Sequence, residues 1–129
     1  MKNIRVFLGG TCNNSTWREQ LKPLLVNVDY FDPVVKDWTP ECQAEEIRQR
    51  EICDIVLYTI TKEMLGIYSI AEVVDDSNKR PEKVILCILE EGLPDFQIKS
   101  LKAVAKMVTG NNAFVSYSLE DVAEYLNSL

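Results

Sequence analysis

Five short apolar segments recur along the chain, and each is bounded by polar residues, Gly or Pro. Runs of this length and composition are typical of β-strands. The first, third and fourth contain almost no polar position, which is typical of parallel strands covered by helices on both faces. The segments are IRVFLGG at 4–10, VNVDYFD at 26–32, DIVLYTI at 54–60, KVILCIL at 83–89 and AFVSY at 113–117.

The stretches between these strands have the spacing and start signals of helices. Thr16 with Glu19, and Ser118 with Asp121, match the capping box at a helix start. Thr39 is a capping residue followed by a proline, which is favoured at the first helical position. The sequence predicts helices over residues 16–26, 39–52, 68–77, 94–108 and 118–129.

Strands that alternate with helices form βαβ units and a parallel sheet. We expect a single domain over residues 1–129: a three-layer α/β/α sandwich with a five-stranded parallel sheet and flavodoxin-like topology. Ligands of such folds bind beyond the carboxyl ends of the strands, at the switch point beside the first strand. That position brings together three loops, at residues 9–16, 31–38 and 61–69.

Two consecutive glycines, Gly9 and Gly10, end the first predicted strand, and small polar residues follow them. They indicate either a tight strand-to-helix turn or a place where a ligand approaches the main chain. The segment GGTCNNST is neither GxGxxG nor a Walker loop. It weakly resembles the Ser/Thr-rich phosphate loop of flavodoxins, so a flavin-binding redox domain is one alternative.

The predicted helix at 68–77 has two different faces. One is apolar and should pack on the sheet; it consists of Ile67, Ile70, Val73 and Val74. The opposite face carries Ser69, Glu72 and Asp76. A solvated polar face is one interpretation, but like charges four residues apart are unfavourable on an exposed helix. Because this helix begins at the predicted ligand edge, Glu72 is also a candidate functional residue.

Charge and composition exclude several classes of function. The chain has 129 residues and a net charge of −6, which argues against binding a nucleic acid polymer or an anionic membrane surface. It contains no histidine, which excludes Ser-His-Asp and Cys-His catalysis and any His-ligated metal. The four cysteines follow no disulfide pattern, and no signal peptide is apparent, so we expect a cytoplasmic protein with free thiols.

Other polar and aromatic residues near the predicted edge leave two interpretations open. Glu45 and Glu46 lie in the middle of the second predicted helix, where they either take part in chemistry or pair with nearby arginines. Trp17, Trp38 and Tyr68 either stack on a bound base or fill gaps in the packing.

The order of these motifs resembles the nucleoside 2-deoxyribosyltransferase-like family. The resemblance covers roughly residues 3–90 and is strongest where the third strand is followed by a glycine and then by a helix with a single Glu. It implies the same flavodoxin-like sandwich. It also implies cleavage of the N-glycosidic bond of a nucleoside or nucleotide, with the sugar passed to a second base or to water. Family chemistry of this kind needs no cofactor or metal, and family members are often homo-oligomers.

By this resemblance, Glu72 is the nucleophile and Glu46 is the acid that handles the leaving base, with Glu45 as its competitor. The substrate contacts implied or expected beside them are Gly9, Gly10, Thr11, Trp38, Ser69 and Asp76, with Trp38 stacking on the base. The segment SIAEVV lacks the small residues that follow the nucleophile in the MELGYA-like run of the known enzymes. A non-catalytic nucleotide-binding module of the same fold is therefore the main alternative. Gln97, Asn111 and Asn112 are candidates for the carboxy-terminal asparagine of the family.

Overall fold

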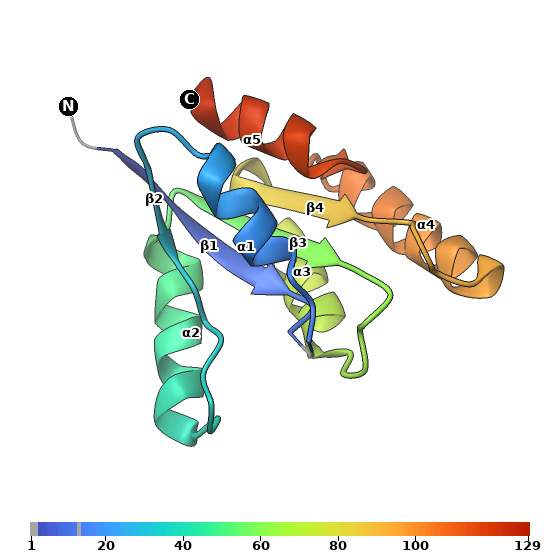
Figure 1. Cartoon of the computed structure of the whole chain (residues 1–129), viewed down its shortest axis with the longest axis horizontal. Helices are drawn as coiled ribbons and strands as arrows, with labels where there is room; N and C mark the ends of the chain where they lie inside the picture. Colours follow the sequence, from blue (N-terminus) through green and yellow to red (C-terminus); the bar gives the residue numbers. More distant parts are fainter. Residues whose placement is uncertain (1–2, 13) are drawn as a thin grey trace.

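A computed structural model describes residues 3–12 and 14–129. Its five strands form one parallel sheet in the order β2-β1-β3-β4-β5, which is the flavodoxin-like order expected from the sequence. The predicted fold is therefore confirmed. The strands are β1 (Ile4–Gly10), β2 (Val28–Phe31), β3 (Ile55–Ile60), β4 (Val84–Ile88) and β5 (Phe114–Ser116). The arrows of β1, β3 and β4 point the same way, so the loops that follow them leave one edge of the sheet (Figure 1).

The structure describes five α-helices, four between successive strands and one after the last strand, and two of the three predicted caps are present. They are α1 (Trp17–Leu21), α2 (Pro40–Ile52), α3 (Tyr68–Lys79), α4 (Asp95–Gly110) and α5 (Leu119–Asn127). The hydroxyl of Thr39 accepts a hydrogen bond from the amide of Cys42, and that of Ser118 accepts one from the amide of Asp121. Among the described residues, no helix has the length and apolar character needed to cross a membrane.

The first helix differs from the prediction. The α-helix ends at Leu21 and continues as a 3-10 turn over Lys22–Leu24, whereas the sequence predicted one helix to residue 26. Pro23 lies in this turn, and a proline has no N–H for the α-helical hydrogen bond. The Thr16 cap is also wrong, because its hydroxyl accepts a hydrogen bond from the Gln20 side chain instead of a backbone amide.

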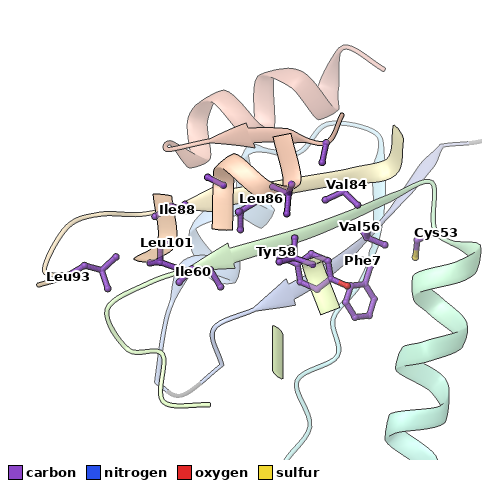
Figure 2. Packing of buried hydrophobic residues seen from close by; sticks show 14 residues of the cluster. Phe7, Cys53, Val56, Tyr58, Ile60, Val84, Leu86, Ile88, Leu93 and Leu101 are labelled. Atoms are coloured by element: carbon purple, nitrogen blue, oxygen red, sulfur yellow. The ribbon is translucent and has the colours of Figure 1, made fainter. Parts of the chain in front are cut away.

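The sheet has a separate apolar core on each face. Alternate residues along a strand point to opposite sides, so β3 sends Val56, Tyr58 and Ile60 into one core and Ile55 and Leu57 into the second. The first core is completed by α3 and α4, and the second by α1 and α5. Figure 2 shows the first core, in which the rings of Phe7 and Tyr58 lie side by side.

The cysteines are free thiols, as the sequence predicted. Cys53 is buried in the first core and Cys87 in the second, as small apolar residues. All four cysteines are free.

Candidate active site

A cleft of about 480 Å³ lies at the carboxyl edge of the sheet, on the side of α2 and α3. Its walls come from the end of β1 and the following loop, the loop after β2, α2, the loop after β3, and the first turns of α3. The three loops expected to meet at this edge all contribute to it. Seven of the eight candidate residues line the cleft: Gly9, Gly10, Thr11, Trp38, Glu46, Ser69 and Glu72. The loop residue Asn13 lies outside the described residues.

The two glycines at the end of β1 are both required by the protein's own packing. A Cβ atom on Gly9 would lie 2.7 Å from the ring of Tyr58, which is too close for any side chain. Gly10 has φ +113°, a conformation that only glycine adopts readily, and a Cβ there would overlap the carbonyl of Thr59. Close packing of β1 on β3 thus accounts for both glycines, and it also leaves bare main chain on the cleft wall.

Arg18 holds the loop after β1 in place. Its buried guanidinium donates hydrogen bonds to the carbonyl oxygens of Leu8 (3.0 Å) and Thr11 (2.7 Å). The Thr11 carbonyl also accepts from the indole of Trp17 at 2.8 Å, and the Thr11 hydroxyl accepts from the amide of Thr61 at 3.0 Å. Trp17 is therefore a core residue rather than a stacking residue, and the shape of the glycine loop depends on α1.

Glu46 and Trp38 form a pair on the α2 side of the cleft. The indole N–H of Trp38 donates to a carboxylate oxygen of Glu46 at 3.3 Å. Burial raises the pKa of Glu46, and the hydrogen bond from Trp38 offsets this in part. Glu45 behaves differently: it is paired with Arg48 at 2.7 Å and with Gln49 on the surface of α2. The structure thus separates the two neighbouring acids and places Glu46 in the cleft.

Glu72 lies on the first turns of α3 with its side chain only 9% exposed. Burial raises its pKa to about 7, and the nearby charge of Arg50, 3.7 Å away, opposes that rise. Glu46 and Asp76 raise it further by charge repulsion. Glu72 and Asp76 on the polar face of this helix are therefore buried rather than solvated.

Asp76 does not reach the cleft, contrary to the expectation that it contacts substrate. It lies one turn after Glu72, about 6 Å farther along the helix, and is fully buried. Its carboxylate accepts two hydrogen bonds from Arg50, both 3.0 Å long, and others from Arg80 and Tyr58. Asp76 is part of a buried ionic cluster behind the cleft.

Ile67 was expected to pack on the sheet and does not. It precedes the first turn of α3 and is 75% exposed, whereas Val73 on the same helix is fully buried. The expected apolar face therefore starts one turn later. Leu65, Tyr68, Val34 and Trp38 are also exposed, and all four line the cleft. The mouth of the cleft thus combines two carboxylates with apolar and aromatic surface.

A family model described as nucleoside 2-deoxyribosyltransferase like matches residues 3–91. The chain belongs to the nucleoside 2-deoxyribosyltransferase-like family. The matched residues include every residue that lines the cleft, from Phe7 to Glu72. Family membership supports a general nucleoside-related function and confirms the resemblance read from the motifs.

The fold of this family member is similar to a solved structure of low sequence identity. A crystal structure of a conserved protein from Enterococcus faecalis V583 superposes with a TM-score of 0.65 at 14% identity, over 98% of each chain. At this identity the likeness shows the fold alone. No curated protein sequence matches the chain.

Two residues important to the geometry were not candidates from the sequence. Arg18 shapes the glycine loop, and Arg50 faces Glu72 from α2. The sequence left open whether nearby arginines pair with Glu45 and Glu46, and Arg50 of this helix pairs instead with acids of α3. In the part of the chain that the structure describes, no cluster of three or more Cys, Asp or Glu side chains is placed to hold a metal ion.

Proposed function

We propose that this protein cleaves the N-glycosidic bond of a nucleoside, with Glu72 as the nucleophile and Glu46 as the acid and base. The sugar is transferred to a second base or to water. The observation that carries this proposal is the pair of carboxylates in one cleft, Glu72 buried and Glu46 partly buried, both with a raised pKa. Two carboxylates that face one substrate are the usual machinery of glycosyl transfer.

In the first step, a carboxylate oxygen of ionised Glu72 attacks the anomeric carbon of the sugar. The bond from this carbon to the base nitrogen breaks, and its electron pair leaves with the base. Glu46 donates its proton to the base as it departs. The product is a glycosyl ester on Glu72.

In the second step, an incoming base or water attacks the anomeric carbon and gives its proton to Glu46. The ester bond breaks and returns Glu72 to its ionised form, so protons and electron pairs balance over the cycle. Burial raises the pKa of Glu46, which favours the protonated form that must donate to the leaving base. In this proposal Trp38, which is exposed beside Glu46, stacks on the base.

The charges on the cleft wall favour a substrate without a 5′-phosphate. Arg18 is the one cationic residue among the described residues that line the cleft. Its guanidinium is committed to main-chain carbonyls, with Asp32 3.7 Å away. Glu46 and Glu72 would repel a phosphate in the same space. We therefore propose uncharged nucleosides, and 2-deoxynucleosides in particular by analogy with the family, as the substrates.

A base-release assay tests the proposal. Wild type, Glu72→Gln and Glu45→Gln are incubated with deoxynucleosides, ribonucleosides and their 5′-monophosphates, and the free base is measured by chromatography. We expect release from deoxynucleosides by wild type and Glu45→Gln, and a loss of at least about a thousandfold in Glu72→Gln. Glu45 is the matched control because it is a surface glutamate outside the cleft.

Three results would contradict the proposal in different ways. Equal release by wild type and Glu72→Gln would remove Glu72 as the nucleophile. Faster release from monophosphates than from nucleosides would refute the assigned substrate class. Nucleoside binding without base release by any of the three proteins would favour the non-catalytic binding module.

A further inference from the structure

Arg50 lies behind Glu72, in the interface between α2 and α3. Its side chain is 8% exposed, and it is not among the described residues that line the cleft. Its three guanidinium nitrogens have different partners. Nε and Nη2 donate to the carboxylate of Asp76, Nη2 also donates to Asp75 at 2.8 Å, and Nη1 lies 3.7 Å from Oε2 of Glu72.

Asp76 fixes the orientation of this guanidinium. Two parallel hydrogen bonds from one arginine to one carboxylate define both its distance and its plane. Asp76 is itself held by the hydroxyl of Tyr58, from β3, and by Arg80, from the end of α3. With Nε and Nη2 occupied, Nη1 is the nitrogen directed at Glu72.

We propose that Arg50 is a positioning residue that acts through Glu72: oriented by Asp76, its guanidinium lies at ion-pair distance, 3.7 Å, from one oxygen of the Glu72 carboxylate and favours its ionised form without touching the substrate. This inference rests on the proposed role of Glu72 as the nucleophile. One oxygen faces Nη1, so the other is left for the anomeric carbon. A nucleophile that is both oriented and charged is what the first step requires.

The balance of charges around Glu72 explains why one arginine matters. Burial, Glu46 from α2 and Asp76 from α3 all raise the pKa of Glu72, and Arg50 from α2 is the charge that lowers it. Burial and the charges of Asp76 and Glu72 all raise the pKa of the Tyr58 phenol on β3, so Tyr58 stays neutral. Loss of the Arg50 charge therefore leaves only influences that protonate the nucleophile.

The decisive comparison is between Arg50→Gln and Arg80→Gln. Both variants remove one arginine from Asp76, but only Arg50 faces Glu72. Two quantities are measured for each: the pH dependence of kcat/KM for base release, and the midpoint of Glu72 titration by carbon-13 NMR of its carboxylate. We expect Arg50→Gln to raise the midpoint of Glu72 titration by about one pH unit or more, and to move the limb of the kcat/KM profile that tracks this midpoint by the same amount. Arg80→Gln should leave both in place, and Arg50→Lys should restore the midpoint in part.

A third measurement needs no variant and covers the case in which Arg50→Gln fails to fold. In the wild type, the nitrogen-15 resonances of the Arg50 guanidinium should shift with the same midpoint as the Glu72 carboxylate. Guanidinium resonances that do not shift as Glu72 titrates would overturn the inference.

The inference and the proposed function can fail separately. If wild type releases base but Arg50→Gln leaves the pH profile and the Glu72 midpoint unchanged, the role of Arg50 is refuted and the proposed function stands. If wild type releases no base while the Glu72 midpoint still rises in Arg50→Gln, the proposed function fails and the coupling of the two charges stands.

Discussion

Ionised Glu72 should destabilise the folded protein, so its replacement by Gln should stabilise it at high pH. The pKa of this carboxyl rises from 4.5 to about 7 on folding, chiefly because of burial. Below pH 4.5 both the folded and the unfolded chain hold the proton, and the group has no effect. As the pH rises from 4.5 to 7, the unfolded chain loses this proton first, so the free energy of unfolding falls.

The size of the effect follows from the two pKa values. A pKa that rises from 4.5 to about 7 corresponds to about 3 kcal/mol at pH 8, where both states are ionised. At pH 5 most of this difference has disappeared, and under about 1 kcal/mol remains. Glu72→Gln, which has nearly the same shape and no charge, should therefore exceed the wild type in stability by about 3 kcal/mol at pH 8 and by much less at pH 5.

Urea denaturation followed by circular dichroism at pH 5 and pH 8 measures both differences. Glu45→Gln is the control, because the pKa of that exposed glutamate is lowered by its hydrogen bond to Gln49, so its replacement should not stabilise the fold at either pH. A Glu72→Gln protein that is no more stable than wild type at pH 8, or equally stabilised at both pH values, would refute the reasoning. It would mean that Glu72 is well solvated or that Arg50 fully compensates its charge.

Gly10→Ala should lower the free energy of unfolding by roughly 2 kcal/mol or more, because an L residue is strained at φ +113° and its Cβ would overlap Thr59. Gly110→Ala adds a methyl group in open space at the end of α4, so it should change the free energy of unfolding by well under about 1 kcal/mol. Trp38→Ala should raise KM for base release about tenfold, through lost stacking on the base, while thermal stability hardly changes because the indole is half exposed. The same variant removes the hydrogen bond to Glu46, which lowers the pKa of that carboxyl, so the limb of the pH profile that reports Glu46 should move to higher pH.

The fold could be predicted from local signals in the sequence. Apolar runs such as the one that forms β3 have a length and composition that few other structures share, and alternation with helices fixes a parallel sheet. The position of the cleft follows from the same argument, since the carboxyl ends of parallel strands meet at one edge. For this reason Glu72 and Trp38, which belong to different loops and helices, were expected in one place.

The details that were wrong depend on contacts between distant segments. A helical wheel places Asp76 on the same face as Glu72. It cannot show that, one turn after Glu72, this face of the helix packs against α2. The partner there is Arg50, 26 residues earlier in the chain. Similarly, nothing near Gly9 in the sequence indicates that the ring of Tyr58 lies against it. Ile67 differs for a local reason: it lies at the very start of α3, where the helix has not yet turned toward the sheet.

The most direct test of the central claim is to look for the glycosyl ester on Glu72. The protein is acid-quenched during turnover of a deoxynucleoside, digested, and analysed by mass spectrometry. We predict a deoxyribosyl adduct on the peptide that contains Glu72 in wild type and in Glu45→Gln, and none in Glu72→Gln. An adduct on another residue, or base release that continues in Glu72→Gln, would contradict the account.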